Sequence, residues 1–391
     1  LHYLPLVWLR IRLQNRLPLR SEAFLEAMAE RQVLRRMGGG YIFIHRYLLE
    51  NFAGLDEVFI LIDQLGDENE RIQQKAFESL KQVGEPALRP LDQVLERTDL
   101  APKHRSHIVT ARDSIQPRRG VGLIQGGKWD DLPDIAWADE IAPGTYSIGE
   151  PEQSDNPPRE IKIKHPYRVS KYLITQAQYL AFQNDDSDRG YGFAEWWKDL
   201  AASENNKQPA EPALRYDNHP MEQVNWYQAI AFCRWLTYRY LEAGLLPSPS
   251  GEGSGVRAEI RLPHEYEWEV AARGTDGRTY SYHGDFDPTK ANTSETNIGQ
   301  TSAVGIFPDG ASPCGAFDMT GNVWEWCQNR YDDQEADDLG GTDRRALRGG
   351  SWRDLQGGAR AAYRYNLRPV GRGDFYGGFR VVLSVPHLKG R

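Results

Sequence analysis

Short apolar patterns with helical spacing mark the chain after about residue 57. They predict amphipathic helices over Val58–Leu65, Ile72–Val83 and Ala87–Leu95. Gly66 and Gly84 end the first two helices, because glycine disfavours a helical backbone. Helices this short bury their apolar faces only by stacking on neighbours. We therefore expect a small all-α region that packs on further helices predicted before residue 55.

The pattern changes from about residue 131 to short strands, frequent turns and nearly all of the tryptophans. Three amphipathic helices are predicted in this part, over Thr175–Phe182, Trp226–Leu236 and Glu265–Ala272. Asn225 is a suitable N-terminal cap for the second of them. The run Trp324–Trp326 alternates apolar and charged residues, which predicts a half-buried strand. The larger part of the chain is thus expected to mix helices, strands and irregular segments.

The stretch Arg348–Leu383 combines a core-like frame with the composition of a recognition surface. Its ends are RGGSW and GFRVV. The glycines permit close backbone approach, and the alternating run after them can bury Phe379 and Val381. Between them, Arg353 to Gly377 holds five Arg, no Lys and no Glu, with scattered aromatic residues. Arg and aromatic side chains among glycines are typical of binding surfaces. The alternative is an irregular glycine-rich loop that packs on its own domain.

Length and charge narrow the possible functions. A chain of 391 residues with 40% hydrophobic content can bury more than one core. Its net charge of −8 argues against nucleic acid or an anionic membrane as the main partner, and no apolar run reaches about 18 residues. Cys233, Cys314 and Cys327 are odd in number and lack CxxC spacing, so we expect reduced thiols and a cytoplasmic location.

Two stretches near the start of the chain resemble known helical modules. RRMGGGYIFIHRYLLENFA resembles the tail that closes the nucleotide-binding region of NACHT-type NTPases, which implies a helical tail over residues 1–56. LGDENERIQQKAFESLKQVGEPALRPL is similar to one HEAT-type repeat, which implies a helical repeat over residues 57–118. No GxxxxGK[ST] phosphate loop occurs. Because the chain begins with Leu, we expect an NTPase module to precede it in a longer protein.

Five motifs follow one another in the larger part of the chain. They are APGTYSIG, VSKYLITQAQYLAF, HPMEQVNWYQAIAFCRWL, RLPHEYEWEVAARG and GAFDMTGNVWEW, closed by RGGSW and GFRVV. In order and spacing they resemble the formylglycine-generating-enzyme, or sulfatase-modifying-factor, domain, which is a variant of the C-type lectin fold. The resemblance implies an α+β fold over residues 119–391, preceded by the small all-α region.

The same resemblance argues against catalysis. Catalytic members hold copper with two cysteines shortly after RGGS, and thiolates are ligands that suit Cu(I). The matching positions here are Asp354 and Ala359, so we expect no copper and no enzymatic activity. The related iron-dependent sulfoxide synthases need a facial set with histidines, but His104 and His107 lack a third partner in the sequence. Serine or cysteine hydrolysis finds no motif either, since no GxSxG elbow occurs.

The segment 353–377 resembles the variable region of proteins diversified by retroelements. Those proteins end in this same lectin-like domain, and adenine-directed mutagenesis rewrites their AAC codons to NNC codons, which cannot encode Lys, Glu, Gln, Met or Trp. Ala359, Arg360, Ala362, Arg364, Pro369 and Arg372 resemble the fixed scaffold, and Gln356 does not fit the codon rule. The residues that fit and are expected to bind ligand are Arg353, Asp354, Leu355, Gly357, Gly358, Tyr363, Tyr365, Asn366, Leu367, Arg368, Gly371, Gly373, Asp374, Phe375 and Tyr376.

A calcium site is also implied by the resemblance. In the enzymes, a loop equivalent to residues 318–325 holds one calcium ion through two end groups and two carbonyls. The matching residues here are Asp318, Gly321, Val323 and Glu325, and oxygen ligands of this kind suit Ca²⁺. The alternative is that Asp318 and Glu325 accept hydrogen bonds from local backbone amides.

These observations lead to one leading hypothesis and two alternatives. We expect a non-catalytic protein that displays a diversified surface on a C-type lectin fold and binds an unidentified macromolecule, most simply a protein. The enzymatic alternative is a divergent oxidase of the formylglycine-generating type. The other alternative is an effector or sensor domain of a NACHT-type signalling protein.

Overall fold

The computed structural model describes the backbone of residues 34–37 and 40–43, and residues 57–126, 128–212, 215–246, 258–336, 338–371 and 376–384. Most of the interpretation of residues 1–56 lies outside these ranges. The chain divides into two compact units, Leu1–Leu80 and Lys81–Arg391. In the smaller unit, β1 (Leu34–Met37) and β2 (Gly40–Phe43) form an antiparallel pair.

The predicted helices after residue 57 are present. Residues 57–64 are helical, followed by α4 (Glu70–Val83) and α5 (Leu88–Leu95). A further helix, α6 (Pro102–Ile115), begins at a proline, as helices often do. None of the helices in the described ranges combines the length and apolar character needed to cross a bilayer.

Helix α6 belongs to the same compact unit as the lectin-like part. Asn218 Nδ2 donates to Asp113 Oδ2 over 2.8 Å, and Arg118 Nη2 donates to the Val304 carbonyl over 2.7 Å. Val109 packs in an apolar cluster with residues 298–307. The boundaries 56/57 and 118/119 expected from sequence stay predictions, and the structure places α6 in the larger compact unit, which begins inside α4. The reason is that hydrogen bonds and apolar contacts join α6 to loops far away in sequence.

His219 lies at this junction and gives a testable pH dependence. Its Nε2 is 3.3 Å from Thr110 Oγ1, which donates to the Ser106 carbonyl, and its Nδ1 is 3.0 Å from Thr301 Oγ1. Burial, assisted by nearby His107, lowers the pKa of His219 to about 3. Below a pH of about 6.5, His219 is protonated in the unfolded chain but stays neutral in the folded chain. The free energy of unfolding therefore decreases as the pH falls.

Between pH 7 and pH 5 this histidine should cost about 2 kcal/mol of unfolding free energy. We expect the wild type to lose about that much more stability over this interval than His219→Gln, which cannot titrate. Urea unfolding of both proteins at the two pH values measures the difference. Equal losses would show that His219 does not titrate as described.

The described residues of the lectin-like part form three small sheets. In the largest, the strand order is β10-β7-β8-β9, with β10 (Gly377–Gly378) parallel to β7 (Trp324–Arg330) and the other pairs antiparallel. The second sheet has the order β5-β11-β6. The remaining strands are β3 (Gly144–Ile148), β4 (Arg159–Ile163), β5 (Tyr167–Val169), β6 (Glu259–Arg261), β8 (Arg345–Arg348), β9 (Tyr365–Leu367) and β11 (Val382–Ser384).

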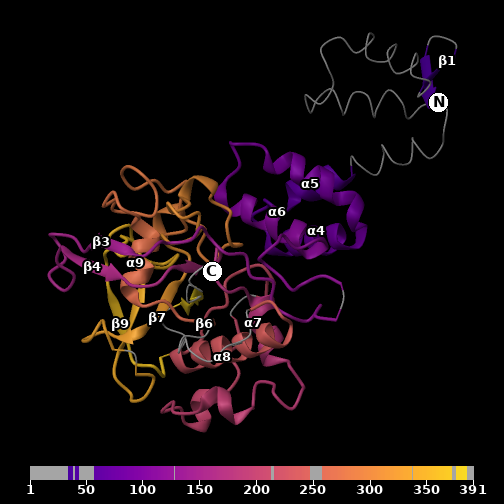
Figure 1. Ribbon diagram of the computed structural model, residues 1–391. Coiled ribbons are helices and arrows are strands. Elements are labelled where there is room, and N and C mark those ends of the chain that lie inside the picture. Colours follow the sequence, from indigo (N-terminus) through magenta and orange to yellow (C-terminus); the bar gives the residue numbers. More distant parts are fainter. Residues whose placement is uncertain are drawn as a thin grey trace, which may run out of the picture. The chain divides into compact units, whose positions relative to one another are not determined.

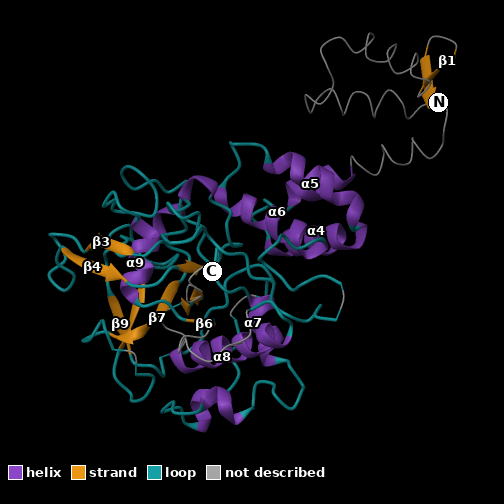
Figure 2. Cartoon of the chain, viewed as in Figure 1, coloured by secondary structure: helices purple, strands orange, loops and turns teal. Residues whose placement is uncertain are grey.

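The described residues of this part also form three α-helices, and loops make up much of the rest (Figures 1 and 2). They are α7 (Gln176–Gln183), α8 (Trp226–Glu242) and α9 (Glu265–Arg273), at the predicted places. The first two begin with reciprocal capping boxes, Thr175 with Gln178 and Asn225 with Gln228. Short 3₁₀ turns span Glu85–Ala87, Ala194–Trp197, Glu204–Lys207, Ser294–Thr296 and Pro308–Gly310.

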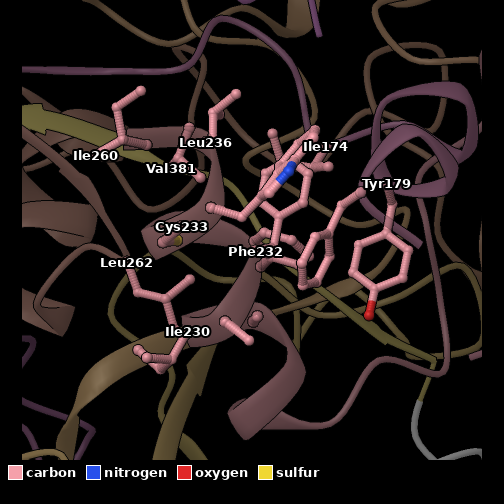
Figure 3. Packing of buried hydrophobic residues seen from close by; sticks show 14 of the residues in the cluster. Ile174, Tyr179, Ile230, Phe232, Cys233, Leu236, Ile260, Leu262 and Val381 are labelled. Atoms are coloured by element: carbon pink, nitrogen blue, oxygen red, sulfur yellow. The ribbon is translucent and has the colours of Figure 1, made fainter. Parts of the chain in front are cut away.

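The main core lies between α7, α8 and residues of β6, β7 and the segment that leads to β11. Tyr179 and Phe232 stack with ring centroids 5.8 Å apart, and Figure 3 shows Ile174 beside them. Phe379 and Val381 are fully buried in the same cluster, as the alternating pattern predicts. The α+β fold expected from sequence is confirmed.

Candidate functional site

Both ends of the segment 353–377 are fixed by glycines in close backbone contacts. Gly349 and Gly350 adopt φ of 93° and 73°, a region that favours glycine. A Cβ on Gly350 would lie 2.9 Å from the Ala359 Cα, and a Cβ on Gly378 would lie 2.6 Å from the Met221 carbonyl oxygen. The paired glycines therefore stand where backbones pass closely, as predicted.

A buried ion pair holds the second end of this frame. Arg380 Nε and Nη2 donate to the two carboxylate oxygens of Glu325 over 2.6 and 2.8 Å, and Trp268 Nε1 donates to Glu325 over 2.7 Å. Burial raises the pKa of Glu325, whereas the Arg380 guanidinium opposes this rise. Both charged side chains have an exposed fraction of 0%. The prediction that Trp324–Trp326 forms a half-buried strand is therefore wrong, because an arginine from a distant segment covers its polar face.

Two of the four residues implied as calcium ligands accept hydrogen bonds from protein groups in this arrangement, and the calcium site itself stays a prediction. Both carboxylate oxygens of Glu325 already accept hydrogen bonds from Arg380, and the buried Asp318 Oδ2 accepts one from the Gly305 amide over 2.7 Å. Within the described residues, no cluster of three or more His, Cys, Asp or Glu could hold a metal.

Most of the residues interpreted as scaffold are buried or form ion pairs that hold the segment on the domain. Ala359 and Ala362 are fully buried, Pro369 is buried, and Arg372 lies outside the described residues. Arg364 is buried and donates to both oxygens of Glu265 over 2.7 and 2.8 Å. The half-buried Arg360 pairs with Glu150.

The sequence interpretation missed the acidic partners of these arginines. Glu265 and Glu269 lie on one face of α9, and Arg348 Nη2 donates to Glu269 over 2.6 Å. Although burial alone would raise it, Arg348 and several hydrogen bonds hold the pKa of Glu269 below its ordinary value. The i, i+4 glutamates among apolar residues of EYEWEVAAR are the sequence signal that could have indicated buried ion pairs.

None of the described candidate ligand-binding positions is fully buried. The exposed ones are Arg353, Leu355, Gly357 and Arg368. The half-buried ones are Asp354, Gly358, Tyr363, Tyr365, Asn366, Leu367, Gly371 and Tyr376. Gly373, Asp374 and Phe375 lie outside the described residues.

The backbone of these positions is fixed by hydrogen bonds to the rest of the domain. The Asp354 carbonyl accepts from the Ser294 amide over 2.9 Å, and the Tyr376 carbonyl accepts from the Trp324 amide over 3.1 Å. The Gln356 amide donates to Glu295 Oε1 over 2.8 Å. Since the partners of these backbone groups lie outside the segment, the path of the chain does not depend on its exposed side chains.

The aromatic residues of the segment are more buried than expected. Tyr363 and Tyr365 pack on Trp324, with ring centroids 6.1 and 5.2 Å away. Tyr376 packs on Trp352 at 4.6 Å, and both rings are half-buried. Trp352 and these tyrosines are therefore half-buried, because the rings cover one another. Trp324 and Trp326 are buried, and Phe379 is buried as predicted.

The positions that match the copper-binding cysteines hold no thiol. Asp354 Oδ2 accepts hydrogen bonds from the Ser351 amide, over 3.0 Å, and from the Ser351 hydroxyl. Ala359 is fully buried. All three cysteines are free and buried elsewhere, and burial raises the pKa of the Cys233 and Cys327 thiols.

Comparison with known proteins identifies the family. Residues 138–385 match the model of the sulfatase-modifying factor enzyme 1-like domain. The chain belongs to this family. It is 27% identical to the mouse protein named inactive C-alpha-formylglycine-generating enzyme 2 over 60% of this chain and 80% of that one. It is also 27% identical to the hercynine oxygenase of Mycolicibacterium thermoresistibile, over 63% of this chain and 58% of the oxygenase.

Two solved structures are similar to this chain. Variable protein 1 of Treponema denticola is 24% identical, with a TM-score of 0.47 over 64% of this chain and 96% of that chain. PvdO of Pseudomonas aeruginosa is 22% identical, with a TM-score of 0.49 over 68% of this chain and 100% of that chain. Because family relatives carry the names of both active and inactive enzymes, membership alone does not assign an activity.

Proposed function

We propose that this chain is a non-catalytic binding protein whose segment 353–377 displays diversified side chains to a macromolecular ligand. The observation that carries the proposal is that two groups of residues in the segment have different roles. Buried scaffold residues and external backbone hydrogen bonds fix the path of the chain, whereas the candidate positions present exposed or half-buried side chains. A surface built in this way can change its side chains without changing its fold.

Matched libraries test the proposal. One library randomises Arg353, Leu355 and Arg368, and the control library randomises the buried Ala359, Ala361 and Ala362 of the same segment. Each is displayed on yeast and selected against a purified target such as ubiquitin. We expect folded, target-specific clones from the first library only. Failure of the first library to yield folded clones, or equal success of the second, would contradict the proposal.

A divergent oxidase is the second candidate, because relatives in this family carry enzyme names. We expect no formylglycine when the chain is incubated aerobically with copper and a cysteine-containing sulfatase peptide. The physical reason is that Asp354 and Ala359 cannot supply a thiolate pair for Cu(I). Mass spectrometry of the peptide measures the product, with the formylglycine-generating enzyme of Thermomonospora curvata as the positive control. Product that disappears with a copper chelator would favour the oxidase.

A further inference from the structure

The described arginines between Arg348 and Arg380 fall into two groups. Those of the frame and scaffold form ion pairs with glutamates from other segments: Arg348 with Glu269, Arg360 with Glu150, Arg364 with Glu265 and Arg380 with Glu325. The exposed Arg353 and Arg368 form no ion pair with a carboxylate of the described residues. The frame and scaffold arginines therefore stabilise the fold, whereas the other two described arginines lie at the surface.

Arg353 is held in a cluster with two aromatic rings. Its Nη1 donates to the Tyr376 hydroxyl over 3.0 Å, and its guanidinium carbon lies 5.8 Å from the centre of that ring. The Trp352 ring also packs on Tyr376, with the two ring centroids 4.6 Å apart. We name Trp352, Arg353 and Tyr376 the Trp-Arg-Tyr cluster. Two of its members lie at opposite ends of the segment in sequence, so the frame brings them together.

The backbone fixes this cluster before any ligand binds. The Trp352 amide donates to the Asn322 carbonyl over 3.0 Å, and the Tyr376 carbonyl accepts from the Trp324 amide over 3.1 Å. Tyr376 has a φ of 34°, a positive value that is unusual for a residue with a side chain. Such backbone strain persists only where surrounding contacts impose it, and it often accompanies binding sites.

The chemistry of the cluster favours a negatively charged acceptor. A guanidinium has five N–H donors in a planar fork that matches a carboxylate, and only one of them contacts Tyr376. The Tyr376 hydroxyl accepts from Arg353, so its own proton can be donated outward. The neighbouring Asp354 uses its Oδ2 within the segment, where it accepts from the Ser351 amide and hydroxyl. The adjacent Trp352 ring and the exposed Leu355 supply apolar contact.

We propose that the Trp-Arg-Tyr cluster is the anchor point of the binding surface and that its partner is a protein segment presenting an Asp or Glu side chain beside an apolar one. This inference rests on the proposed display function and names the chemistry of the ligand. The chain as a whole carries a net charge of −8, so long-range attraction does not steer an acidic partner. The selectivity comes from charge-assisted hydrogen bonds at contact distance.

A random peptide library selected on the immobilised full chain tests the inference. We expect the selected peptides to be enriched in Asp and Glu relative to the input. Arg353→Gln should weaken the best acidic peptide about tenfold or more, because it removes a charge-assisted pair. Arg368→Gln, which changes the other exposed arginine, should bind that peptide like the wild type. Changing the acidic residue of the peptide to its amide should match the loss seen with Arg353→Gln.

The possible failures are distinguishable. Neutral peptides, tighter binding of phosphorylated peptides, or unchanged binding by Arg353→Gln would overturn the carboxylate anchor while leaving the display function in place. Peptides that still bind after Arg353, Leu355 and Arg368 are all changed to Ser would overturn the proposed function itself. A selection that enriches no peptide would count against both.

Discussion

Arg380→Met should lower the free energy of unfolding by about 3 to 5 kcal/mol, because it leaves a charged carboxylate buried without its partner. The wild-type guanidinium donates to both oxygens of Glu325, and neither side chain has measurable exposure. It also donates to the Ser170 and Phe317 carbonyls over 3.0 and 2.9 Å, which would lose these donors. Urea unfolding at pH 7 measures the change.

Two further variants test the cause of this loss. Arg353→Met removes an exposed arginine from the same segment and should change stability by no more than about 0.5 kcal/mol. The double variant Glu325→Leu with Arg380→Met removes both charges and should be more stable than Arg380→Met alone, since no buried charge is left unpaired. A double variant that is less stable than the single one would contradict this explanation.

Phe379→Ala should cost roughly 3 to 5 kcal/mol, because it removes a fully buried ring and leaves a cavity. The ring packs edge-to-face on Phe232 and Tyr179, with centroids 5.3 and 6.2 Å away, so it joins the end of the segment to α8 and α7. Thermal or urea unfolding measures the loss. The control is Leu355→Ala, whose side chain is 64% exposed and whose removal should cost little. Similar losses for the two variants would show that the segment belongs to the core.

Local signals allowed the helices to be predicted. Thr175 and Asn225 each precede a glutamine three residues later, and both pairs form capping boxes in the structure. The extent of α8 was underestimated: it continues past Leu236 to Glu242, and the next glycine is Gly244. A helix end is poorly specified where several residues with adequate helical propensity follow one another.

Contacts between distant residues explain what the sequence interpretation did not foresee. Glu325 seemed to lie on an exposed strand face because its partner Arg380 is 55 residues away. Tyr363 and Tyr365 are half-buried because Trp324 lies beneath them, and nothing in their local pattern indicates that contact. The scaffold positions within the variable segment were indicated by the resemblance alone, and Ala359 and Ala362 among them are fully buried.

The most direct test of the display account is thermal unfolding of two matched triple variants. One changes the surface residues Arg353, Leu355 and Arg368 to Ser, and the other changes the fully buried Ala359, Ala361 and Ala362 to Ser. The account predicts a melting temperature within about 2 °C of the wild type for the surface variant and a decrease of roughly 10 °C for the buried one, through overpacking and buried hydroxyls. A surface variant that loses as much stability as the buried one would contradict the claim that these side chains are free to serve binding.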